Sequence, residues 1–554
     1  MRTSTSEFLG ALAGALTVAV AGTMLTSAAS PKFYADDPVW IEHDTQDASG
    51  IKPLEVDLFV DLTTNLVAGQ NAPAARRSAN VNTVDEVPDS SWFTNRLGSR
   101  PMTPQEIAKG PNTTGGPAAG AWTITSSKSD GVTPGFTVKD GAGQRWFLKF
   151  DPPGHRAMAT GTEVAVTKLM WALGYNVPEN HIAYVQREQL VIGEAAKFTP
   201  PGRKPRAMRN SDIDNLLERA NREQDGSYRV VASKALPGKP VGRVRFVDTR
   251  PDDPNDLVPH QDRRELRAYG VFAAWLNHVD AKAMNSLDVL VSENGKSVVR
   301  HYLIDFGSAL GSGGVGPADY WAGSEYLVQP RDVAKQMVSL GFVVPKWRST
   351  PFYEARAIGR LPRHNADFNP DSWKPRVPNQ AFLHARSDDK FWAATRLAAL
   401  TTEMIRAAVR TGEFGDVAAE EFLVRALAER RDAIRSAYLT AVNPISTPEL
   451  DAAGTLTFKN VAVDADVAKM PRGYHAAWST FDNTTRETAL IGETSAATPQ
   501  FQAPVGLPRN EGAFVKVDVS AVGTGYAAWA KPVSAYFRLG RGGWSLVGFE
   551  RTAE

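Results

Sequence analysis

The sequence contains no cysteine among its 554 residues. Disulfides, thiolate nucleophiles and metal sites built on cysteine ligands are therefore excluded. The chain also lacks an excess of one charge, because 62 Lys and Arg residues face 61 Asp and Glu residues and leave a net charge of +1. A chain without a basic field has little electrostatic attraction for a polyanion, so nucleic acid is not an expected partner.

Long hydrophobic runs are absent beyond the N-terminus. There, Arg2 precedes an apolar stretch from Phe8 to Leu25, which small residues follow up to Ser30. This order is typical of a secretory signal peptide, and an uncleaved anchor is the alternative because ~20 apolar residues span a bilayer. Residues 1–29 are therefore predicted to be a signal peptide or N-terminal anchor. We expect an exported protein, in the periplasm, in the cell envelope or secreted, whose only membrane contact is this segment.

Composition and length indicate a folded chain of more than one domain. The hydrophobic fraction is 42% and the charged fraction 22%, as in folded soluble proteins. A single core stops growing at roughly 250–300 residues. A Gly- and Pro-rich run at 110–120 predicts the end of an N-terminal extension and linker, 30–120, to which the sequence assigns no chemistry. After Pro444, short alternating aromatic segments predict a β-rich domain over residues 443–554.

Between these parts, the segment 121–442 begins with three predicted strands, at 121–125, 136–139 and 145–150. The last two are joined by 140–143, a stretch suited to a hairpin. The loop between the first two contains Gly131 and Gly135, and such a loop can bring backbone N–H groups to a phosphate.

Helical periodicity follows the strands. Residues 161–173 predict an amphipathic helix with Glu163 in its first turn, where a carboxylate is either a partner of the helix dipole or half of an inward ion pair. A further strand is predicted at 228–233 and a helix at 262–277. Beyond Gly307 the strongest predicted helices are 391–410 and 416–441.

The densest polar pattern lies between these helices. It reads His278-x-Asp280-x-Lys282-x-x-Asn285, and Asp305-Phe306-Gly307 follows at the end of an apolar run. Phosphoryl transfer requires a cation for the inner phosphates, carboxylate and amide oxygens for a metal ion, and a group beside the incoming hydroxyl. The sequence contains each of these groups.

In this order of elements and motifs, residues 121–310 resemble the protein kinases, and residues up to about 442 continue the resemblance through helical character alone. The implied fold is α+β, with an antiparallel β N-lobe and a helical C-lobe in a kinase-like domain over 121–442. The resemblance implies that Lys149 contacts the inner phosphates and that Glu163 pairs with it. It also implies ATP as the nucleotide, with Gly131 and Gly135 in the phosphate loop.

The same resemblance assigns the remaining site residues. Asp280 would accept or orient the hydroxyl of the acceptor, and Lys282 would touch the transferring phosphate. Asn285 and Asp305 would bind Mg or Mn, with Asp305 as the principal ligand. His278 would organise the loop.

Three departures place the chain among atypical kinases, similar to secreted or toxin-type kinases of bacteria. The phosphate loop has no G-x-G-x-x-G pattern, no Ala-Pro-Glu triplet follows Gly307, and the stretch from Asn285 to Asp305 is long, with a predicted hairpin at 293–295. The function implied is an exported phosphotransferase that modifies a hydroxyl of a protein, a sugar or a small molecule. Nucleotidyl transfer with the same metal ligands remains open.

Two other readings remain open. A pseudokinase would use the same fold as a binding or scaffold protein of the cell envelope, but it would not need the charged residues in combination. A metal-dependent hydrolase would use His278, Asp280 and Asp305 as ligands, but it leaves Lys149 and Asn285 unexplained.

Overall fold

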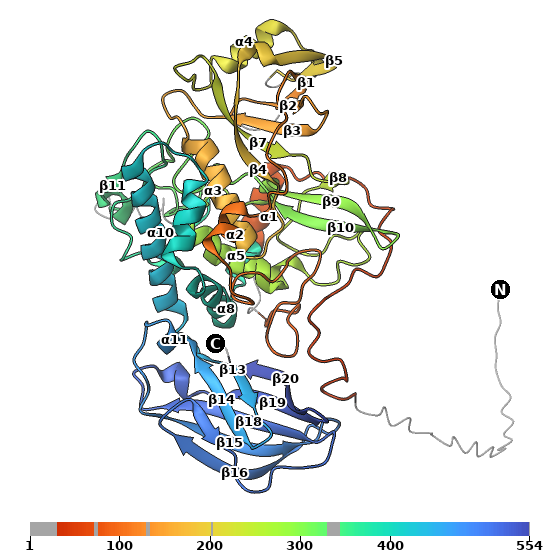
Figure 1. Cartoon of the computed structure of the whole chain (residues 1–554), viewed down its shortest axis with the longest axis vertical. Helices are drawn as coiled ribbons and strands as arrows, with labels where there is room; N and C mark the ends of the chain where they lie inside the picture. The colour runs from red at the N-terminus through yellow and green to blue at the C-terminus, as the bar shows by residue number, and fades with distance from the viewer. Residues whose placement is uncertain (1–29, 71–75, 129–132, 201–202, 329–343, 553–554) are drawn as a thin grey trace, which may run out of the picture.

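The computed structural model describes residues 30–552 except 71–75, 129–132, 201–202 and 329–343. Figure 1 shows three tiers: a β-sheet at the top, helices in the middle with a smaller sheet beside them, and a β-rich domain at the bottom. The predicted signal peptide or anchor, 1–29, lies outside the described residues. In the ranges described, no helix is both long and apolar enough to cross a membrane.

The upper sheet has seven strands in the order β4-β7-β3-β2-β1-β5-β6. Its strands are β1 Trp122–Ser127, β2 Gly135–Lys139, β3 Arg145–Phe150, β4 Asn180–Val185, β5 Leu190–Phe198, β6 Arg206–Ala207 and β7 Tyr228–Lys234. The expected antiparallel sheet is wrong at one pairing, because β5 runs parallel to β1. The chain crosses from β4 at one edge to β5 near the other, and it arrives there in the direction of β1.

The helix that follows β3 is α3, Met158–Ala172. It begins three residues before the predicted start at residue 161, because the side chain of Asp151, which lies outside the helix, caps the N–H groups of its first turn. The carboxylate of Asp151 accepts the backbone N–H groups of Ala157, Ala159 and Thr160 at 2.8, 2.9 and 2.9 Å. Nearly every residue of α3 is buried, so the helix fills the space between the sheet and the helices below it (Figure 1).

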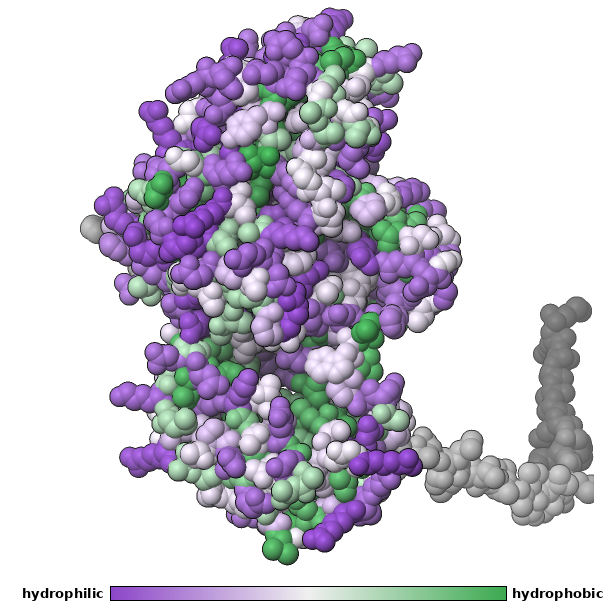
Figure 2. All heavy atoms as spheres, viewed as in Figure 1, coloured by the Kyte–Doolittle hydropathy of each residue, from purple (hydrophilic) through white to green (hydrophobic). Residues whose placement is uncertain are grey.

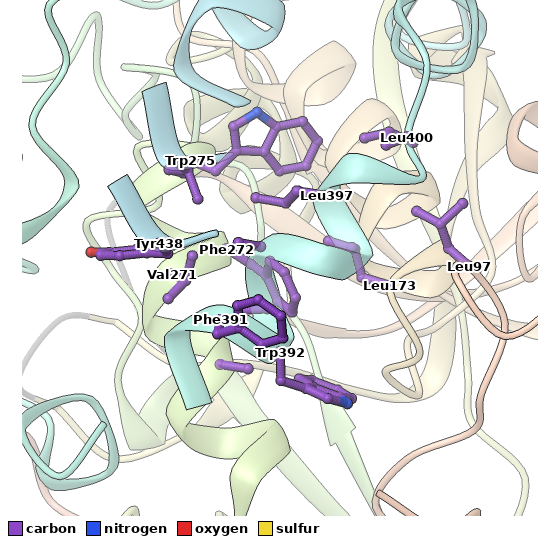
Figure 3. Packing of buried hydrophobic residues seen from close by; sticks show 14 of the residues in the cluster. Leu97, Leu173, Val271, Phe272, Trp275, Phe391, Trp392, Leu397, Leu400 and Tyr438 are labelled. Carbon is purple, nitrogen blue, oxygen red and sulfur yellow. The ribbon is translucent and has the colours of Figure 1, made fainter. Parts of the chain in front are cut away.

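The middle tier is helical. Its helices are α5 Arg264–Trp275, α7 Gln380–Leu383, α8 Ser387–Ala398, α9 Thr402–Arg410 and α10 Val417–Tyr438, and α1 Leu58–Gln70, α2 Pro104–Lys109 and α4 Asn210–Leu217 precede them in the chain. Figure 3 shows Phe272 and Trp275 of α5 in one apolar cluster with Trp392 and Leu397 of α8. This core supports the loop that leaves the end of α5.

The helix predicted over 391–410 is two helices. The chain turns after Ala398, and the Thr401 hydroxyl accepts the Met404 N–H at 3.2 Å and caps a new helix. The helix predicted at 416–441 is confirmed as α10, with Asp416 as its cap.

A three-stranded sheet lies beside the helices, formed by β8 Lys239–Gly242, β9 Ser286–Glu293 and β10 Lys296–Leu303. The hairpin predicted at 293–295 is confirmed as the β9–β10 turn, where Asn294 and Gly295 have positive φ angles. The register pairs Ser286 with Leu303. The long stretch between Asn285 and Asp305 is therefore an antiparallel hairpin whose two ends lie next to each other.

The C-terminal domain is β-rich, as predicted. A three-stranded sheet has the order β13 Ile445–Leu450, β14 Thr455–Asn460, β17 Gln500–Gln502, and a five-stranded sheet has the order β16 Thr488–Ala496, β15 Gly473–Phe481, β18 Phe514–Val522, β19 Val533–Gly540, β20 Gly543–Arg551. The remaining short elements of the described residues are α11 Val461–Asp464, β11 Phe352–Tyr353, β12 Leu361–Pro362 and the 3₁₀ turns 187–189, 260–262, 283–285, 346–349, 370–372 and 527–530.

Residues before β1 connect these tiers. Phe33 packs against Phe481 and Tyr536 of the C-terminal domain, and further along Leu54 donates its N–H to Val241 O at 2.8 Å. The stretch 110–120, predicted as a linker, is held against the upper sheet, where Ala118 N–H bonds the Asp140 carboxylate at 2.8 Å. On the face seen in Figure 2, hydrophilic side chains predominate and hydrophobic ones form small patches.

Candidate active site

Lys149 lies on β3 and forms two ion pairs. Its Nζ is 3.0 Å from Glu163 Oε2 of α3 and 2.8 Å from Asp305 Oδ1. Burial would lower the pKa of Lys149, but the two carboxylates outweigh that effect and raise it above its usual value. The ammonium therefore remains charged, and it joins three segments that are distant in the sequence.

Glu163 connects α3 to the Asp-Phe-Gly triplet. Its two carboxylate oxygens accept the backbone N–H groups of Phe306 and Gly307, each at 3.0 Å. A Cβ at Gly307 would lie 3.2 Å from Glu163 Oε2, so glycine permits this close approach. Asn180 of β4 donates to the same carboxylate at 3.4 Å. No local sequence pattern predicts these three contacts.

Asp305 has a φ of 63°, in the left-handed region that non-glycine residues rarely adopt. Such a conformation costs roughly 1 kcal/mol or more. Burial opposes the charged carboxylate, but the Lys149 and Lys128 ammonium groups outweigh burial and lower the pKa of Asp305 to about 2. The strained residue is thus held as an anion that faces Lys149.

The loop after α5 brings three predicted residues together. Lys282 Nζ donates to Asp280 Oδ1 at 2.7 Å, and Asn285 Nδ2 donates to Asp280 Oδ2 at 2.9 Å and to the Asp280 carbonyl at 2.8 Å. Ile304 N–H then bonds Asn285 O at 3.0 Å and joins this loop to the strand end that carries Asp305. Because Asn285 uses its amide nitrogen in the loop, its Oδ1 makes no hydrogen bond to another described residue.

His278 lies in the core. Its side chain is fully buried, and its ring packs 5.5 Å from the Phe306 ring and 6.2 Å from the Tyr269 ring. Burial lowers the pKa of His278 to about 4, so the ring is neutral. The ring thus packs against the Phe306 ring of the Asp-Phe-Gly segment, and its role in organising the loop stays a prediction.

The predicted phosphate loop contains two glycines, and the structure describes one of them. Gly131 lies outside the described residues. Gly135 is the first residue of β2 and pairs with Lys149, and a Cβ on it would lie 2.4 Å from Leu148 O. Close strand pairing thus explains glycine at 135, and its contact with a nucleotide stays a prediction.

A cavity of about 30 Å³ lies between the upper sheet and the helices. Its walls are formed by Thr133, Phe150, Ala159, Thr160, Val231, Gly307, Ser308, Gly314 and the Lys149, Glu163 and Asp305 triad. This volume suits about one water molecule, whereas ligand pockets are typically about 300–1,000 Å³. This space alone is therefore too small for a whole nucleotide, most of which would lie outside it.

Two of the predicted metal ligands, Asp305 and Asn285, carry oxygen atoms of the kind that Mg²⁺ prefers. In the part of the chain that the structure describes, no group of three His, Asp or Glu side chains could hold a metal ion. The hydrolase reading, which needs His278, Asp280 and Asp305 as joint ligands, therefore lacks its ligand set. Mg²⁺ usually takes one or two carboxylates and completes its shell with water and substrate phosphates, which suits Asp305 together with Asn285 Oδ1.

Comparisons with known proteins give distant matches. No protein-family model and no curated protein matches the chain. The crystal structure of a Helicobacter pylori proinflammatory kinase, CtkA, is similar at 13% identity and a TM-score of 0.27, over 55% of this chain and 94% of that one. The crystal structure of the golgi casein kinase is similar at 11% identity and a TM-score of 0.26, over 72% and 94%. At TM-scores this low, the kinase-like arrangement rests on the ion pairs and loop contacts described above.

Proposed function

We propose that this protein is a kinase-like phosphotransferase that uses ATP and Mg or Mn to modify a hydroxyl acceptor. The observation that supports this most is the Lys149 ammonium, which contacts Glu163 and Asp305 at once. In protein kinases the strand lysine, the helix glutamate and the Asp of the Asp-Phe-Gly triplet must all be in place for transfer.

Each site residue would have its own role in the transfer. Lys149 holds the inner phosphates, and Glu163 fixes the direction of its ammonium. Asp305 and Asn285 Oδ1 bind the metal ion that accompanies the nucleotide, and the bound nucleotide supplies the phosphoryl group. Asp280 orients the acceptor hydroxyl and receives its proton, while Lys282 lies beside it and neutralises charge on the transferring group.

A binding or scaffold protein of the cell envelope is the second candidate. The observation that favours it is the small cavity of about 30 Å³ at the triad. A scaffold needs no further space at the triad, whereas an enzyme must place phosphates beside Lys149. ATP is scarce outside the cytoplasm, and the protein is predicted to be exported. Whether it turns over ATP is therefore the question that separates the enzyme from the scaffold.

Incubation of purified residues 31–554 with labelled ATP and either Mg or Mn tests the proposal. We expect self-labelling or ATP hydrolysis that requires the metal, and that disappears in Asp305→Ala. Asp319→Ala is the matched control, since Asp319 is an exposed carboxylate outside the site. No metal-dependent turnover and no thermal shift with ATP and Mn would favour the scaffold.

A further inference from the structure

Asn180 is the first residue of β4, and its side chain is fully buried beside Glu163. Its amide nitrogen, Nδ2, donates to Glu163 Oε1 at 3.4 Å and to Thr167 Oγ1, one turn further along α3, at 2.8 Å. The Thr167 hydroxyl in turn donates to the Glu163 carbonyl at 2.7 Å. An amide nitrogen has two hydrogens to donate, so both bonds can form together. Asn180 is therefore held to the turn of α3 that carries Glu163.

The bond from Asn180 completes a set of four donors around the Glu163 carboxylate. Oε1 accepts from Asn180 and from the Phe306 N–H. Oε2 accepts from Lys149 and from the Gly307 N–H. The other end of the Asn180 amide, Oδ1, is buried and makes no hydrogen bond to a described residue. A flipped amide would place that oxygen against the carboxylate, so the donor orientation is the favourable one.

The N-terminal extension holds Asn180 from the outer edge of the upper sheet. β4 is an edge strand, so one side of its backbone has no neighbouring strand. The segment 109–114, which follows α2, lies along that side. Asn112 Nδ2 donates to the Asn180 carbonyl at 3.0 Å and lies 3.3 Å from His181 Nδ1.

Further hydrogen bonds fix the segment 109–114 in place. The N–H groups of Thr113 and Thr114 donate to the Glu179 carboxylate, just before β4, at 2.9 and 3.2 Å. Bonds to an ionised acceptor are roughly twice as strong as neutral ones. Lys168 of α3 donates from Nζ to the Lys109 carbonyl at 2.9 Å. The segment therefore contacts both β4 and α3.

We propose that Asn180 is a positioning residue that holds the Glu163 carboxylate toward Lys149, and that Asn112 of the N-terminal extension keeps Asn180 in place. Each link is a hydrogen bond, from Asn112 to Asn180 and from Asn180 to Glu163. Asn180 acts on phosphoryl transfer only through Glu163. The effect on turnover rests on the proposed function, whereas the effect on the order of the Asp-Phe-Gly segment does not.

Four variants of the purified protein test the two links. Asn180→Leu keeps about the shape of the side chain and removes its donor. Asn112→Ala removes the outer bond, and Asn112→Gln keeps an amide donor. Thr114→Val is the matched control, because it removes the 3.0 Å bond from the same segment to Glu179 and leaves the bond from Asn112 intact.

Three measurements follow each variant. Hydrogen exchange of a peptide spanning 304–308 reports the N–H groups of Phe306 and Gly307, which bond Glu163. Exchange of a peptide from α10 reports the stability of the helical tier as a whole. Labelled ATP with Mn reports turnover.

In Asn180→Leu we expect exchange of 304–308 to rise about three- to tenfold, the effect of one lost hydrogen bond, while exchange of α10 stays within about twofold. The kcat/KM for ATP should fall about tenfold, because the direction of the Lys149 ammonium is less well fixed. Asn112→Ala should change both quantities in the same direction by a smaller factor, and Asn112→Gln should restore most of the loss. Thr114→Val should match the wild type.

Several outcomes would overturn the inference. Unchanged exchange of 304–308 in Asn180→Leu refutes the link to Glu163, and an equal rise in α10 reduces the residue to a support of overall stability. Faster exchange with unchanged kcat/KM removes the role in turnover, and a wild-type exchange rate in Asn112→Ala refutes the link to the extension. If Asn180→Leu does not fold, Thr167→Val releases the Asn180 amide with a side chain of the same shape, and a wild-type exchange rate in that variant would equally refute the arrangement. If the wild type turns over no ATP, the proposed function fails, while exchange of 304–308 still decides the role of Asn180.

Discussion

The triad of Lys149, Glu163 and Asp305 makes a prediction about stability that needs no substrate. Lys149→Met removes the ammonium and keeps an unbranched apolar side chain. It leaves two carboxylates without their cation. The Asp305 side chain is 37% exposed and can be hydrated, whereas the Glu163 side chain is 2% exposed and cannot. Most of the loss in folding stability therefore comes from Glu163, whose buried charge is left without its cation.

The magnitude follows from that difference. Removing one partner of a buried ion pair costs about 3–5 kcal/mol, and Glu163 keeps the N–H groups of Phe306 and Gly307. We therefore expect about 3 kcal/mol for Lys149→Met. Glu163→Gln alone also destabilises, because one amide oxygen cannot replace two carboxylate oxygens. In the double variant, however, no unpaired charge is buried, so its loss should be about 2 kcal/mol smaller than the sum of the single losses.

Calorimetric unfolding of the four proteins at pH 7 measures this coupling and resolves transitions of separate domains. Lys139→Met is the matched control, since Lys139 is an exposed lysine on the neighbouring strand β2 and the change should stay within about 0.5 kcal/mol. If the two single losses add within about 0.5 kcal/mol, Lys149 and Glu163 are not coupled and the triad does not exist as described.

Three further predictions concern the carboxylates. Asp305→Ala should abolish the thermal shift with ATP and Mn, because it removes the proposed principal metal ligand; an unchanged shift would remove that assignment. Asp280→Ala should bind ATP normally but lose about 10²–10⁴-fold in turnover, and full turnover would exclude Asp280 from the mechanism. Because the pKa of Asp305 is lowered to about 2, its charge stabilises the fold above pH 3.8 and this contribution disappears as the pH falls through 2. The stability difference between the wild type and Asp305→Asn should shrink over that range, by less than about 1 kcal/mol because the side chain is partly exposed; acid unfolding curves that stay parallel would contradict it.

Local patterns made part of this structure predictable. Alternation over 145–150 and the helical period after residue 161 correspond to β3 and α3, and the hairpin at 293–295 was set by residues that tolerate positive φ. The ion pair between Lys149 and Glu163 was expected from the kinase resemblance and is present at 3.0 Å. The roles of these residues in transfer stay predictions.

Other features have no local signal. Backbone N–H groups carry no residue identity, so the bonds from Phe306 and Gly307 to Glu163 could not be read from the sequence. β4 shows no clear alternation, since the side chains between its two buried ends are half-buried or exposed.

The distribution of polar groups favours an enzyme over a scaffold. A scaffold can be held together by the triad alone, because those charges neutralise one another and tie α3 to the Asp-Phe-Gly segment. The side chains of Asp280 and Asn285 take no part in that bridge. Their contacts instead leave the Asn285 Oδ1 without a hydrogen-bond partner among the described residues. If Asp305 separated from Lys149, its carboxylate could bind a metal ion and the ammonium could contact a phosphate. A scaffold has no such use for these groups.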